Sequence, residues 1–192
     1  MSCGANLKGT ENMKNTSTRK LVYAAVCLAL AMVLPFLTGQ IPQIGQALSP
    51  MHIPVFLCGF LCGWPWGMLV GFIAPLLRSV LFHMPTLYPN AVCMAFELAT
   101  YGAVSGILYK LLPRKPWSVY VTLIVAMIAG RLVWGAVKWV LLSMNGTGFT
   151  LEAFLAGAVI DAFPGIILHI ILVPILVLAL EKAKLGLNRG RA

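Results

Sequence analysis

The apolar segment from Trp117 to Ser143 constrains the fold of this chain most strongly. It is long enough to cross a bilayer, since about 20 apolar residues span the hydrocarbon core as a helix. Arg131 nevertheless lies near its middle, and Lys138 follows two turns later. A cation at this depth costs at least about 2.5–3.5 kcal/mol, so two cations in one helix require a structural or functional reason.

The two cations share one face of this helix with a tryptophan. Arg131, Trp134 and Lys138 are spaced i, i+3 and i+7, which places them on the same side of a helix. We interpret that side as the lining of a ligand-binding cavity. The alternative is a pair of structural ion pairs inside a helix bundle.

Similar apolar segments occur along most of the chain. Its 192 residues are 60% hydrophobic and 10% charged, which is typical of an integral membrane protein. We predict an all-α bundle of six transmembrane helices within residues 19–184, preceded by a disordered cytoplasmic arm (1–18) and followed by a basic tail (185–192). The predicted spans are residues 19–37, 51–62, 66–82, 90–112, 117–143 and 151–180.

The basic residues indicate how the bundle lies in the membrane. The formal net charge is +9, and Lys and Arg cluster before the first span, between the fourth and fifth, and after the last. The three loops predicted to be external contain neither Lys nor Arg. By the positive-inside rule, both termini are expected to be cytoplasmic. The clusters flank spans and are not interleaved with aromatic residues in a soluble module, so nucleic-acid binding is not expected.

Charged side chains also occur in the outer half of the predicted spans. Each of the two anions can pair with a neighbouring cation, which leaves one positive charge over. A buried cation without a partner is unfavourable unless an anionic or strongly hydrogen-bonding group reaches it. We therefore predict a substrate with a carboxylate or phosphate, whereas in the alternative Lys138 extends to the external interface. The five charged residues are Arg78, Glu97, Arg131, Lys138 and Asp161.

Further candidates lie near the external rim. His52 is a predicted binding residue, and Tyr88 and Asn90 are predicted to line the pocket rim. His52, His83 and His169 do not cluster by spacing, so we expect ordinary hydrogen bonding and neither a metal site nor a pH switch. No cofactor is expected.

Several catalytic motifs are absent from the sequence. It contains no G-x-x-x-x-G-K-[ST] loop, so the chain is not expected to hydrolyse ATP itself. It also lacks G-x-S-x-G and H-E-x-x-H. We therefore do not expect an enzyme.

Two sequence blocks carry a resemblance to a known family. The first helix is rich in alanine and includes Ala25-x-x-x-Ala29, and the block SPMHIPVFLCGFLCGWPWG precedes a third helix. With the chain length and the six spans, residues 19–184 resemble the substrate-binding S component of an energy-coupling factor (ECF) transporter.

The resemblance implies a function and partners. An S component captures a vitamin from outside the cell and topples in the membrane to release it inside. It works with a transmembrane coupling subunit and two ABC-type ATPases in the plasma membrane of a prokaryote. The small residues on the first helix, here Ala25 and Ala29, would dock the coupling subunit, because small side chains let helices approach closely in lipid.

The substrate and two alternative functions remain open at this stage. The extra cation favours pantothenate, followed by riboflavin, folate or a pyridoxine-like compound. The alternatives are a stand-alone small transporter and a non-transport membrane protein, either an intramembrane enzyme or a structural or signalling bundle.

Overall fold

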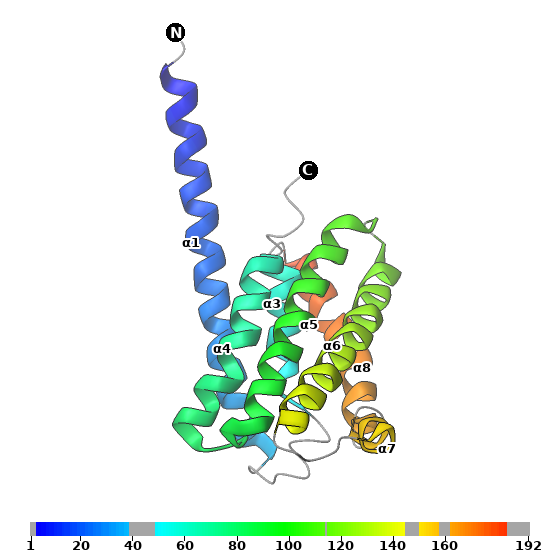
Figure 1. Cartoon of the computed structure of the whole chain (residues 1–192). Helices are drawn as coiled ribbons and strands as arrows, with labels where there is room; N and C mark the ends of the chain where they lie inside the picture. The colour runs from blue at the N-terminus through cyan, green and yellow to red at the C-terminus, as the bar shows by residue number, and fades with distance from the viewer. Residues whose placement is uncertain (1–2, 39–48, 114, 145–149, 158–161, 184–192) are drawn as a thin grey trace.

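The computed structural model describes residues 3–38, 49–113, 115–144, 150–157 and 162–183. Every secondary-structure element within these residues is a helix, as the sequence predicted (Figure 1). The elements are α1 (Cys3–Val33), η1 (Leu34–Thr38), α3 (His52–Cys62), α4 (Trp64–Phe82), η2 (Leu87–Ala91), α5 (Val92–Leu111), α6 (Pro116–Met144), α7 (Leu151–Leu155) and α8 (Phe163–Lys182).

Five of the described helical segments are long and apolar enough to cross a membrane. The helix at the predicted second span, α3, is too short to cross a membrane. It has 11 residues and is about 16 Å long at 1.5 Å per residue. A hydrocarbon core is about 30 Å thick. All 11 residues of α3 are buried, in contact with α1, α4, α5 and α8. The long helices are Ser17–Phe36, Trp64–Phe82, Leu87–Leu111, Pro116–Met144 and Phe163–Lys182.

Glycines allow α3, α4 and α5 to pack closely. Gly63 connects α3 to α4 with a φ of 95°, a conformation that residues with a side chain rarely adopt. A Cβ added at Gly102 of α5 would lie 2.2 Å from the carbonyl oxygen of Gly67 in α4. The backbones of α4 and α5 therefore touch, and this contact fixes the register of the side chains that α5 presents to α3.

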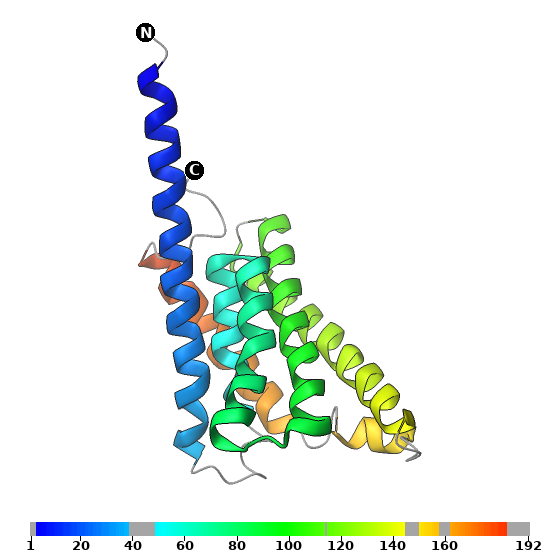
Figure 2. The same ribbon diagram turned by 60° about the vertical axis from the view of Figure 1, so that its left-hand side comes forward.

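The helix ends separate into two groups (Figures 1 and 2). The start of α1, the α3–α4 turn, the α5–α6 connection and the end of α8 lie at one end of the bundle, which we call the basic end. Lys110, Lys115 and Lys182 belong to the last turn of α5, the residue before α6 and the last turn of α8. The η1, η2 and α7 elements and the start of α8 lie at the opposite end. This grouping agrees with the predicted topology, whose orientation in a membrane stays a prediction.

Helix α1 is held against the bundle at two levels. Its buried face, with Ala24, Cys27 and Ala31, packs against α3 and α4. Near the basic end, the Cys62 thiol of α3 donates a weak hydrogen bond to the carbonyl oxygen of Lys20, at 3.7 Å. Toward the opposite end, Arg78 of α4 binds the last turn of α1, as described below.

Two helix boundaries differ from the predicted ones. Helix α1 begins at Cys3, well before residue 19, where the first span was predicted to begin. Cys3–Val33 contains no proline to interrupt it. The predicted last span (151–180) is divided into α7 and α8. Pro164 lies in the first turn of α8, where its missing N–H costs no hydrogen bond and its fixed φ favours a helix start. The basic tail (185–192) lies outside the described residues.

Candidate functional site

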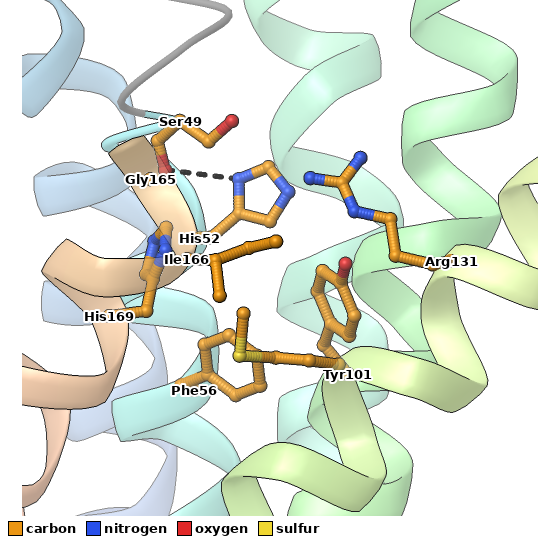
Figure 3. Close-up of a pocket in the computed structure, with 9 residues that line it drawn as sticks. Ser49, His52, Phe56, Tyr101, Arg131, Gly165, Ile166 and His169 are labelled. Carbon is orange, nitrogen blue, oxygen red and sulfur yellow. Dashed lines mark hydrogen bonds between the residues drawn. The ribbon is translucent and has the colours of Figure 1, made fainter. Parts of the chain in front are cut away.

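A small cavity lies between α3, α5, α6 and α8 (Figure 3). Its volume is about 10 Å³, enough for roughly one water molecule. A larger ligand therefore requires the lining side chains or the surrounding helices to move. The lining residues are Ser49, His52, Phe56, Tyr101, Met127, Arg131, Gly165, Ile166 and His169.

Three nitrogen atoms in the cavity lining are buried without a hydrogen-bond partner among the described residues. They are His52 Nε2, His169 Nε2 and Arg131 Nε. Leaving a buried donor or acceptor unsatisfied costs about 1–3 kcal/mol. Three such atoms around one cavity indicate that it is built to hold a polar ligand or water.

Glu97 does not line the cavity itself, but it contacts three of the side chains that do. Its side chain is 2% exposed. Its Oε1 accepts a hydrogen bond from the Tyr101 hydroxyl at 2.7 Å and forms an ion pair with Arg131 Nη1 at 3.2 Å. His52 Nε2 lies 3.8 Å from the same oxygen. One carboxylate on α5 thus faces groups from α3, α5 and α6, and its charge is balanced by that of Arg131.

The remaining lining is aromatic and apolar. The rings of Phe56 and Tyr101 are stacked, with centroids 4.9 Å apart and an interplanar angle of 28°. The His52 ring lies 5.3 Å from Tyr101 and 5.6 Å from His169. A ligand at this site would meet nitrogen atoms on one side and hydrocarbon on the other, as is usual for small-molecule sites.

Gly130 of α6 sets the position of the Tyr101 ring. A Cβ added at Gly130 would lie 2.2 Å from Tyr101 Cε1. We expect Gly130→Ala to lower the free energy of unfolding by about 1–3 kcal/mol, because the ring must shift out of its place in a packed core. Denaturant titrations in detergent measure this loss. This loss of stability should largely disappear in a Tyr101→Ala background, because the methyl group added at residue 130 then meets no tyrosine ring.

Gly135 offers a matched control for this prediction. Its added Cβ would lie 2.2 Å from Phe154 Cε2 of α7, a residue that does not line the cavity. The loss from Gly135→Ala should be relieved by Phe154→Ala and not by Tyr101→Ala. Equal relief of both glycine variants by Tyr101→Ala would contradict the assignment of Gly130 to the tyrosine.

The structure brings three of the predicted binding residues together. Arg131 and His52 line the cavity, and Glu97 lies directly behind them. Trp134 and Lys138 share a face of α6, with Lys138 Nζ 4.5 Å from the Trp134 ring centroid, but neither lines this cavity. Asp161 lies outside the described residues.

Arg78 was predicted to belong to the binding site, but its side chain contacts α1 and does not line the cavity. It is 4% exposed, and its Nη1 donates to the carbonyl oxygen of Met32 at 2.8 Å. Its guanidinium carbon lies 5.3 Å from the Phe36 ring centroid and 5.4 Å from that of Phe82. Arg78 thus binds the carboxyl-terminal turn of α1, where a cation is favoured by the helix dipole. Glu97 pairs with Arg131 and not with Arg78.

The other predicted residues lie away from the cavity lining. Tyr88 donates its hydroxyl to the carbonyl oxygen of Leu141 at 3.0 Å. Asn90 Nδ2 donates to the Thr86 hydroxyl at 2.9 Å. The predicted docking residues, Ala25 and Ala29, are exposed on the outer side of α1.

Sequence reasoning missed most of the aromatic and histidine lining. The three histidines were expected not to cluster, yet His52 and His169 are neighbours. A usable signal was present, because most lining residues form pairs one helical turn apart, at i and i+4. These pairs are His52 with Phe56, Met127 with Arg131, and Gly165 with His169. Tyr101 stands in the same relation to Glu97.

Comparison with known proteins yields one match. A family model described as "ECF transporter, substrate-specific component" matches residues 19–177. Neither a curated protein nor a solved structure matches the chain.

Proposed function

Because the chain belongs to the family of substrate-specific components of ECF transporters, we propose that it captures a water-soluble micronutrient in the cavity between α3, α5, α6 and α8. The family consists of substrate-binding transport subunits and not of enzymes. The observation that carries the location of the site is the set of three buried nitrogen atoms around one cavity. A bound ligand would supply their missing hydrogen bonds.

The proposed orientation places the basic end of the bundle in the cytoplasm of a prokaryote and the opposite end outside. The positive-inside rule supports it, because the described lysines at helix ends lie together at one end. His52, at the start of α3, and Gly165, in the first turn of α8, lie toward the opposite end. Substrate would therefore enter from outside, and a coupling subunit with two ATPases would drive its release inside.

Pantothenate is the first substrate to test. It combines a carboxylate, an amide and two hydroxyl groups with an apolar dimethyl group. Its polar groups match the unpaired nitrogen atoms, and its methyl groups match the aromatic lining. Arg131 is already neutralised by Glu97, so the ion-pair argument for an anionic substrate is weaker than the sequence suggested.

Native mass spectrometry of the purified protein tests this proposal. We expect a bound small molecule, and calorimetric titration of the ligand-free protein should show binding of at least one of pantothenate, riboflavin, folate and pyridoxine, of which pantothenate is tested first. A bound mass that corresponds to another vitamin would replace pantothenate and keep the proposed function. Protein that carries no small molecule and binds none of the four would contradict the proposed function.

A further inference from the structure

The hydrogen bond of His52 determines what its other nitrogen offers to a ligand. Its Nδ1 lies 3.0 Å from the carbonyl oxygen of Ser49 (Figure 3). A carbonyl oxygen can only accept, so Nδ1 carries a proton. In the tautomer with this single ring proton, Nε2 is an acceptor. Glu97 Oε1 lies 3.8 Å from Nε2, which is beyond hydrogen-bond distance, and Nε2 has no hydrogen-bond partner among the described residues.

Arg131 offers the complementary group. Its Nη1 is engaged by Glu97 at 3.2 Å, whereas its Nε is buried without a partner among the described residues. A guanidinium nitrogen can only donate. The cavity therefore presents a donor on α6 and an acceptor on α3.

Formal charge adds a second restriction. Within the part of the chain that the structure describes, no lining residue of the cavity is acidic, and Glu97 behind the cavity is already paired with Arg131. Among these residues a cationic ligand would find no counter-charge of its own, and an anionic ligand would compete with Glu97 for the same guanidinium. An uncharged ligand meets neither penalty.

We infer that the cavity selects an uncharged polar group that carries a hydrogen-bond donor beside an acceptor, such as an amide or a hydroxyl. The donor binds His52 Nε2, the acceptor binds Arg131 Nε, and the apolar body of the ligand packs on Phe56 and Tyr101. This inference rests on the proposed function, and it concerns the class of ligand and not the existence of a binding site.

Matched pairs of probes test the inference by calorimetric titration of the ligand-free full-length protein. The pairs are panthenol with pantothenate, nicotinamide with nicotinate, and riboflavin with its 5′-phosphate, and thiamin serves as the cationic probe. In at least one pair we expect the neutral member to bind at least as tightly as its anionic partner. Tighter binding of the anionic member in every pair that binds would overturn the inference while supporting the proposed function. Binding of thiamin alone would do the same. Binding by none of the probes would also overturn it, and native mass spectrometry then decides on the proposed function separately.

Replacing His52 tests the acceptor directly. His52→Phe keeps a ring beside Tyr101 and removes the acceptor nitrogen, and His52→Gln serves as a second variant that retains an acceptor oxygen. For the neutral probe that binds, we expect affinity to fall at least about tenfold in His52→Phe and less in His52→Gln. His83→Phe is the control, because His83 is exposed and lies outside the cavity lining. Equal affinity of the wild type and both His52 variants would overturn the inference.

Discussion

Substitution of Ala25 or Ala29 by tryptophan is expected to abolish uptake while ligand binding stays unchanged. Both alanines are exposed on α1, on the side away from the buried residues Ala24, Cys27 and Ala31. If this side docks a coupling subunit, its small side chains let two helices approach closely, and packing drives their association in lipid. An indole ring would hold the helices apart and leave the distant cavity unaffected.

The measurements are uptake by cells that express the whole transporter and ligand affinity of the purified subunit. Leu30→Trp is the matched control, since Leu30 is 42% exposed on another side of α1 and is already large. We expect its uptake to remain near that of the wild type. An Ala25→Trp protein that copurifies with the ATPase module and transports normally would show that this side contacts only lipid.

Arg131→Ala is expected to have the second large effect, mainly on stability. It would leave the Glu97 carboxylate 2% exposed and without its ion-pair partner. Removing one member of a buried ion pair costs about 3–5 kcal/mol. Glu97→Gln in the same chain should restore most of this loss, because a neutral amide needs no counter-charge. Denaturant titration of the wild type, Arg131→Ala, Glu97→Gln and the double variant measures the loss of stability and its recovery.

Ligand affinity separates the two roles of Arg131. Arg131→Lys keeps a positive charge for Glu97 and loses the Nε donor, so we expect most of the stability to remain and affinity to fall by about tenfold or more. In the Glu97→Gln, Arg131→Ala double variant, stability should return while affinity stays low. Recovery of affinity together with stability would remove Arg131 from the binding site and leave it a structural role.

The helices were predictable because a long apolar run has few alternatives in a bilayer. The boundaries of α4, α5 and α6 are therefore close to the predicted ones. The division of the last span was harder to predict, because residues 151–157 are too few to distinguish a short separate helix from the first turns of a longer one. The bounds of α3 also match the predicted segment 51–62. Its enclosure by other helices was not predicted, since composition records apolarity and not whether a helix faces lipid or protein.

The buried charged residues of the candidate site could be predicted from the sequence, whereas its aromatic residues could not. Arg131 and Glu97 could be found because each charge in a span demands a partner. Tyr101 and Phe56 carry no such signal, since aromatic side chains are common in any membrane helix. Their meeting with His169 depends on how α3, α5 and α8 are rotated against one another. That rotation is set by close contacts such as Gly102 with Gly67, which no local pattern specifies.

The two attachments of α1 have a mechanical consequence. Cys62 holds the Lys20 carbonyl at one level, and Arg78 holds the Met32 carbonyl at another, between two phenylalanine rings. Because α1 also packs against α3 and α4, we expect a torque on α1 to turn α3 and α4 with it. A partner that grips the outer side of α1 would therefore have a lever on the entire bundle, and the cavity would tilt as a unit without first being pulled apart.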